Sequence, residues 1–88
     1  MYLLGVVLLV LINVGFGNLV SSSRVVSILT PDSAPMKRLV RMAKERDCLI
    51  DASCGRKTQS ILVMDSGHVV LSALASETIS NKFAKQED

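Results

Sequence analysis

The feature that most constrains this chain is its uncharged and strongly apolar start. Residues 1–23 carry no charged side chain, and the run from Leu3 to Val14 is almost entirely apolar. A transmembrane helix needs about 20 such residues, so this run is short of a span. A secretory signal would have a basic residue near its start, whereas the first basic residue here is Arg24. The richness in Val, Leu and Ile favours a buried strand over a membrane segment.

Residues 1–9 could also be an extension that results from a misassigned start of the reading frame. Any residue from Val6 to Val10 could correspond to an alternative initiation codon, and the intact mass of the natively expressed protein would decide this. We therefore divide the chain into a hydrophobic N-terminal extension (1–9), one domain (10–85) and an acidic tail (86–88).

The chain is too short to bury all of its apolar surface by itself. It has 88 residues, of which 49% are hydrophobic, and a domain of this size leaves much apolar surface uncovered when it folds alone. Burial in partner subunits or in a membrane would resolve this surplus. We expect a homo-oligomer.

Apolar periodicity and turn residues predict a small α+β domain with the element order ββαβββα. Strands are expected within 3–14, 24–29, 48–51, 61–64 and 69–73, and helices over 35–46 and 76–85. Asp32 and Ser33 are suitable N-caps for the first helix, and Ser76 for the second. The Ser66–Gly67 pair between two short β runs indicates a hairpin.

Charged residues gather in the middle of the chain. Residues 24–57 hold eight basic side chains and four acidic ones. A basic stretch beside a neutral start suits a polyanion as partner. A single charge run is, however, more often a solvated helix face.

The expected helix over 35–46 has an apolar face and a basic face. Its apolar positions recur at helical spacing: Met36, Leu39, Val40 and Ala43. Its basic positions are Lys37, Arg38, Arg41, Lys44 and Arg46. Basic groups in the last turn also favour the helix dipole, so part of this charge serves the helix itself. We take Lys37, Arg38 and Arg41 as auxiliary phosphate contacts.

The strongest candidate for a binding site is the turn Gly55-Arg56-Lys57. Glycine permits a tight turn and close backbone approach to a ligand. Arginine offers a planar fork that matches phosphate, and lysine adds a point charge. A solubilising loop explains the same residues nearly as well. Arg24 follows a serine cluster and is a further cation that could contact phosphate. The same residues are equally compatible with an ordinary loop.

Signals for catalysis and metal binding are weak. His68 is the only histidine, and its pairing with Asp65 or Asp51 would lack a nucleophile elbow or paired carboxylates. Cys48 and Cys54 do not form a C-x-x-C pair and are too few for a structural zinc site. We interpret both cysteines as small apolar residues that are buried or half-buried, in a protein of a reducing compartment. We expect neither an enzyme nor a cofactor.

Gly15-x-Gly17 lacks the residues of a phosphate-binding motif. A Walker A motif needs Lys-Ser/Thr after its glycines, and the dinucleotide fingerprint needs a third glycine. We therefore interpret it as a structural turn. The chain has only three aromatic residues, which leaves little for stacking on single-stranded nucleobases.

Several ordered segments together resemble the RemA-like family of extracellular-matrix regulators. The matching segments are Ile12–Asn18, Ser21–Arg24, Thr30–Arg38, Leu49–Thr58 and Val63–Ser72. Two positions differ slightly from the family pattern: Thr30 stands where the family usually has Ser, and Ser53 where it usually has Thr. Family chains usually begin just before the first segment, so residues 1–9 depart from the pattern.

The resemblance implies a bacterial, cytoplasmic, nucleoid-associated regulator of transcription that binds double-stranded DNA and is linked to biofilm matrix genes. It also implies a LytTR-like fold and a ring of subunits. The family's DNA-contacting residues fall on Arg24, Arg56 and Lys57, the last in place of the commoner Arg. Lysine keeps the charge but loses the bidentate fork, which favours phosphate contact over base readout. The alternative is a non-catalytic interaction protein whose basic helix binds an acidic partner or a membrane surface.

Overall fold

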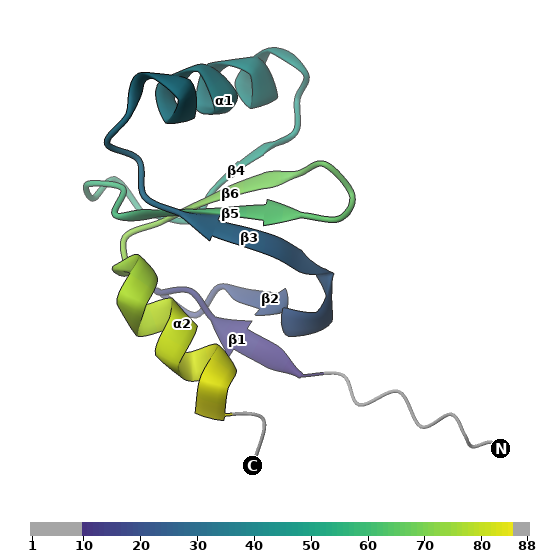
Figure 1. Ribbon diagram of the computed structural model, residues 1–88, viewed down its shortest axis with the longest axis vertical. Helices are drawn as coiled ribbons and strands as arrows, with labels where there is room; N and C mark the ends of the chain where they lie inside the picture. The colour runs from purple at the N-terminus through teal and green to yellow at the C-terminus, as the bar shows by residue number, and fades with distance from the viewer. Residues whose placement is uncertain (1–9, 86–88) are drawn as a thin grey trace, which may run out of the picture.

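The computed structural model describes residues 10–85 and shows one mixed α+β domain (Figure 1). Its strands are β1 (Leu11–Asn13), β2 (Leu19–Ser21), β3 (Val25–Leu29), β4 (Leu49–Asp51), β5 (Ser60–Met64) and β6 (Val69–Ser72). Its helices are α1 (Ala34–Glu45), α2 (Ser76–Ala84) and the short 3-10 helix η1 (Ser22–Arg24). The α+β class is confirmed. The extension 1–9 and the tail 86–88 lie outside the described residues.

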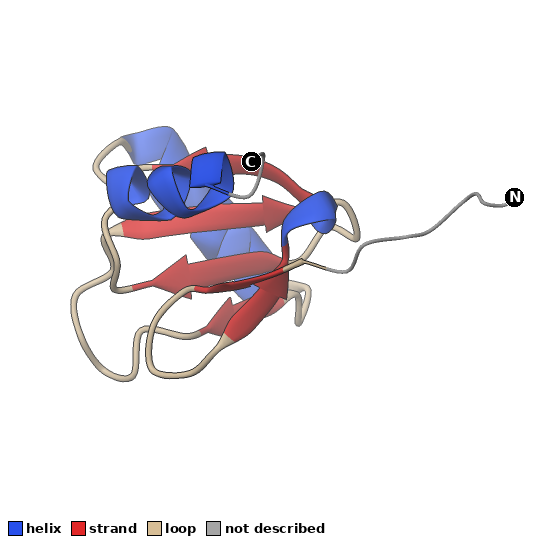
Figure 2. Cartoon of the chain, turned by 90° about the horizontal axis from the view of Figure 1, so that it is seen from below, coloured by secondary structure: helices blue, strands red, loops and turns tan. Residues whose placement is uncertain are grey.

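The strands form a four-stranded sheet and a separate two-stranded one. The larger sheet has the order β3-β5-β6-β4, in which β4 and β6 run parallel and the other pairs antiparallel. Strands β1 and β2 pair antiparallel, with Ile12 opposite Val20. Loops join the strands at both ends of the sheet (Figure 2).

The four-stranded sheet is covered on both faces. Helix α1 lies over one face, and α2 with the β1–β2 pair lies over the other (Figure 1). Alternate side chains of β5 therefore enter two cores, because successive residues of a strand point to opposite faces. Ile61 packs with the α1 cluster and Leu62 with the α2 cluster, and both are fully buried.

Helix α1 forms as its sequence pattern predicts. Ser33 is its N-cap, and the Ser33 side chain accepts a hydrogen bond from the backbone N–H of Met36. This satisfies one of the free N–H groups at the helix start. Ala43 is buried against the sheet. The predicted β5–β6 hairpin is also confirmed, with Gly67 at a φ of 89° in its turn.

Some local predictions are wrong. The observed order has one strand more than predicted, because Leu19–Ser21 pairs with β1. Arg24 ends η1 and does not belong to a strand. The N-cap of α2 is Ala75, with no side-chain hydrogen bond, so Ser76 does not cap this helix. Cys54 is exposed in a turn, whereas Cys48 is half-buried as expected.

Candidate functional site

Two loops from distant parts of the sequence meet at the end of β6. The buried Ser72 hydroxyl donates a hydrogen bond of 2.6 Å to the carbonyl oxygen of Val14, at the start of the first loop. The backbone N–H of Gln59, at the end of the second loop, donates to the Ser72 carbonyl at 2.8 Å. One residue of the sheet thus anchors the loop over 14–18 and the loop over 52–59. We call these the first loop and the second loop.

Hydrogen bonds to the Asp51 carboxylate, at the end of β4, hold the conformation of the second loop. Asp51 accepts a hydrogen bond from the backbone N–H of Ser53 at 2.9 Å and another from the Ser53 hydroxyl. These two bonds hold the pKa of Asp51 below its ordinary value of 3.8, the hydroxyl having the larger effect. The N–H of Arg56 then donates to the Ser53 carbonyl at 3.1 Å. The backbone that carries the two cations is therefore fixed.

Arg56 and Lys57 project from the second loop into solvent, and both are exposed. Gly55 has a φ of 78°, and a Cβ at this position would meet nothing within 4 Å. The glycine is thus required by the backbone conformation and not by close packing. Among residues 10–85 the only ion pair joins two other residues, so neither cation is ion-paired. The acidic residue Asp32 lines a hollow together with Lys57.

Arg56 contacts an aromatic ring of the first loop. Its guanidinium carbon lies over the ring of Phe16, 5.7 Å from the centroid, which is within the range of a cation–π interaction. Together these side chains line an open hollow of about 580 Å³. Its complete lining is Phe16, Arg56, Lys57, Gln59, Ala73 and Leu74.

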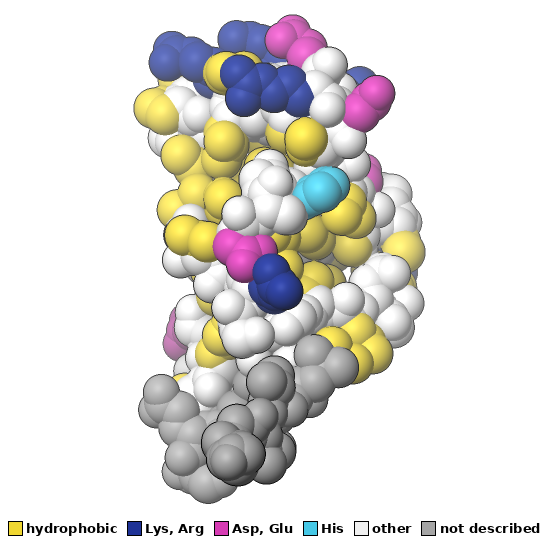
Figure 3. Space-filling view, turned by 90° about the vertical axis from the view of Figure 1, so that its right-hand side faces the viewer, with side chains coloured by type: hydrophobic (Ala, Val, Ile, Leu, Met, Phe, Trp, Pro, Cys, Tyr) yellow, Lys and Arg dark blue, Asp and Glu magenta, His cyan; other side chains and the backbone are white. Residues whose placement is uncertain are grey.

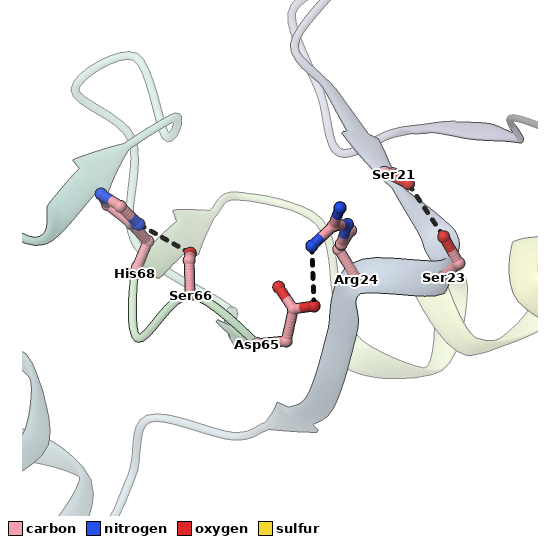
Figure 4. A network of polar contacts seen from close by, with 6 residues as sticks. All are labelled: Ser21, Ser23, Arg24, Asp65, Ser66 and His68. Carbon is pink, nitrogen blue, oxygen red and sulfur yellow. Dashed lines mark hydrogen bonds and ion pairs between the residues drawn. The ribbon is translucent and has the colours of Figure 1, made fainter.

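Arg24 lies at a different place and has a carboxylate partner. Its guanidinium is 3.1 Å from the Asp65 carboxylate, and the Asp65 N–H donates to the Arg24 carbonyl at 2.8 Å (Figure 4). The Arg24 side chain keeps 68% of its surface exposed. An exposed pair of this kind contributes only about 0–1 kcal/mol, so the guanidinium can exchange Asp65 for a phosphate at small cost.

The structure does not bring the predicted site residues of one chain together. Val25, next to Arg24, pairs with Met64 at the end of β5, whereas Arg56 and Lys57 precede the start of β5. The five residues of this strand span about 16 Å. Arg24 and the Arg56–Lys57 tip therefore mark opposite ends of the sheet.

The auxiliary basic residues of α1 form a separate surface. Basic side chains gather over α1 at the top of the molecule (Figure 3). Lys37 lines a hollow with Pro31 and Thr58, at the end of the sheet where the second loop lies. Arg38 and Arg41 are exposed on the same helix. Lys37 is thus placed beside the second loop, which carries the Arg56–Lys57 tip.

The residues considered for catalysis do not form a constellation. The His68 Nδ1 lies 2.7 Å from the Ser66 hydroxyl, and Asp65 pairs with Arg24 (Figure 4). Asp51, the other carboxylate considered for His68, bonds to Ser53. Across residues 10–85, no three His, Cys, Asp or Glu side chains converge as metal ligands would. None of the helices within residues 10–85 is long and apolar enough to cross a membrane.

The sequence alone does not indicate Phe16 as part of the site. It predicts only a structural turn at Gly15-x-Gly17, and this turn is present, because Gly15, Phe16 and Gly17 all have positive φ. The available signal was a bulky apolar residue between two glycines. Its contact with Arg56 was not visible, because it depends on the anchoring of both loops at Ser72.

Comparisons of the sequence with known proteins identify a family and several relatives. The model of the family described as extracellular matrix regulatory protein A-like, or RemA-like, matches residues 11–83. A relative from Acaryochloris marina is 54% identical over 89% of this chain and 89% of its own length. A relative from Dictyoglomus turgidum is 64% identical over 80% of this chain and 82% of its own. Both bear the name "Putative regulatory protein".

The chain belongs to the RemA-like family, as its ordered segments indicated. A further relative with the same type of name, from Halalkalibacterium halodurans, is 47% identical over 89% of this chain and 90% of its own length. These names describe regulators, and none of the three describes an enzyme.

Proposed function

We propose that this protein is an oligomeric, non-catalytic regulator of transcription that binds double-stranded DNA. The carrying observation is the exposed Arg56–Lys57 tip on a loop whose backbone is fixed by hydrogen bonds. Family membership adds a regulatory role. In this proposal the target genes include those for biofilm and extracellular matrix, and the protein works in the bacterial cytoplasm at the nucleoid.

The cationic side chains of the Arg56–Lys57 tip are chemically suited to bind the phosphates of the DNA backbone. Arginine donates in-plane N–H groups in a fork that matches two phosphate oxygens, and lysine places a compact charge on a neighbouring phosphate. Phosphate contacts fix the position of a protein on the duplex but do not read sequence. Sequence preference then arises in part from how readily the duplex bends around the protein.

Assembly explains how so few cations bind tightly. Arg24, Arg56 and Lys57 of one chain would neutralise only a few phosphates, each contributing about −0.9 to the salt slope of binding. In a ring, Arg24 of one copy and the Arg56–Lys57 tip of a neighbour can face the same duplex, although they lie apart within one chain. Several engaged copies then add avidity.

The sheet edges supply the surface for such assembly. Among the described strands, β3 pairs only with β5 and β4 only with β6, so both edges of the larger sheet are open. Each edge strand also exposes an apolar side chain, Val26 in β3 at 66% and Ile50 in β4 at 49%. Open edges and exposed apolar residues favour association. Two different edges would meet head to tail, which generates a ring when the rotation closes. A LytTR-like fold remains a prediction from the family resemblance.

Fluorescence anisotropy with a labelled duplex tests the proposal. We expect binding whose affinity falls linearly with the logarithm of salt concentration. No binding in low-salt buffer would refute it. Flotation with anionic vesicles tests the alternative in which the basic face of α1 binds a membrane, and the DNA-binding proposal predicts that the protein stays unbound.

A further inference from the structure

Phe16 is placed where stability alone would not favour a phenylalanine. Its side chain is 54% exposed, and its φ is 56°, in the left-handed region that favours glycine and asparagine. A residue held in this region costs of order 1–3 kcal/mol, and such residues cluster at functional sites. Exposure of the ring adds a further cost, because its apolar surface stays in water. These costs point to a role outside the core.

The first loop fixes the direction of this ring. The Gly15 N–H donates to the Asn13 side-chain oxygen at 2.7 Å, and the Asn18 side chain donates to the Gly15 carbonyl at 3.1 Å. The Val14 N–H donates to the Asn18 carbonyl at 2.8 Å, which closes the loop. The ring is therefore presented by a braced turn and not by a free chain.

The ring meets the guanidinium of Arg56 at the rim of an open hollow. The cation lies over the ring, 5.7 Å from its centroid. The contact restricts Arg56, and among residues 10–85 no carboxylate forms an ion pair with its guanidinium. Its N–H groups therefore stay available for a phosphate, while binding removes less conformational freedom.

We propose that Phe16 is a positioning residue of the DNA-binding site. It holds the Arg56 guanidinium toward the duplex backbone, and the exposed part of its ring packs against deoxyribose beside the contacted phosphate. This inference rests on the proposed function. It assigns the first loop to the binding surface together with the second loop.

The test compares Phe16→Leu and Phe16→Trp with the unchanged protein in duplex titrations. Leucine keeps an apolar, unbranched Cβ but has no aromatic face, whereas tryptophan is the strongest partner for a cation. We expect Phe16→Leu to weaken binding by about two- to five-fold for each engaged copy. The salt slope should stay unchanged, because no charge is removed. Phe16→Trp should retain wild-type affinity or exceed it.

A double-mutant cycle with Arg56→Gln separates positioning from a merely structural role. If Phe16 acts through Arg56, then Phe16→Leu loses less affinity in the Arg56→Gln background than in the unchanged protein, and only the loss from the sugar contact remains. An equal loss in both backgrounds would overturn the proposal. The Phe16→Trp protein gives an independent readout, because the chain has no other tryptophan. Its emission should change when duplex is added, and an unchanged spectrum in a protein that binds would overturn the sugar contact.

The failure of this inference differs from the failure of the proposed function. If the unchanged protein ignores duplex DNA, both are refuted. If it binds and Phe16→Leu binds equally well, Phe16 has no positioning role while the proposed function stands. Circular dichroism of each variant establishes whether it is folded. If Phe16→Leu does not fold, the change in tryptophan emission of Phe16→Trp on addition of duplex tests whether this position contacts DNA.

Discussion

Removing the Arg56 guanidinium should weaken DNA binding without disturbing the fold. In Arg56→Ala the second loop keeps the Asp51–Ser53 hydrogen bonds and the backbone bond from residue 56, because none of them involves the lost side chain. The change removes only the contact with Phe16, which contributes about 0.5–1 kcal/mol at an exposed site. We therefore expect a loss in the free energy of unfolding of no more than about 1 kcal/mol.

The expected loss of affinity is much larger. A hydrogen bond to a charged group contributes about 1.5–3 kcal/mol, which corresponds to at least about ten-fold in the dissociation constant for each copy that contacts DNA. Each copy also neutralises one phosphate fewer, so the slope of log affinity against log salt should flatten by about 0.9 per engaged copy. Anisotropy titrations at several salt concentrations measure both quantities.

Arg46→Ala is the matched control for this prediction. Arg46 is an exposed arginine at the C-cap of α1, and it lines a hollow with Ser66 and Gly67, away from the second loop. The Arg46→Ala substitution removes the same charge from the surface beside the Ser66–Gly67 turn. We expect an affinity and a salt slope close to those of the unchanged protein. Equal affinity and slope for Arg56→Ala and the unchanged protein would refute the reasoning, as would equal losses in both variants.

Three further predictions concern the scaffold. Leu62→Ala empties a fully buried position and should lower the unfolding free energy by about 2–5 kcal/mol in denaturant titrations. Ser72→Ala leaves the carbonyl of Val14 without its buried donor, so we expect a loss of about 1–3 kcal/mol, and an unchanged midpoint would contradict this. The lowered pKa of Asp51 predicts a contribution to stability that is fully present well above pH 3.8 and is lost as pH falls through the lowered value. Acid titrations of the unchanged protein and Asp51→Asn should therefore converge at low pH, and a constant difference would be inconsistent with it.

Local patterns predicted much of this fold. Helix α1 followed from apolar spacing and from the N-cap Ser33, and the β5–β6 hairpin followed from the Ser66–Gly67 turn. Both elements are specified by residues near each other in sequence. Strand β2 was missed because its three residues gain strand structure only by pairing with β1, on the far side of the first loop.

The site was only partly predictable for the same reason. The Arg56–Lys57 tip was recognised from its residue types, and the structure shows it exposed. That Arg24 sits at the other end of the sheet depends on the register of β3 against β5, which no local pattern indicates. The Phe16 contact depends on two loops that meet at Ser72.

The central claim is that several copies of this chain together bind one duplex, and light scattering tests it most directly. We predict a particle of several chains in the absence of DNA and a larger, defined complex when a duplex is added at low salt. A mass equal to one chain, unchanged by the duplex, would contradict it.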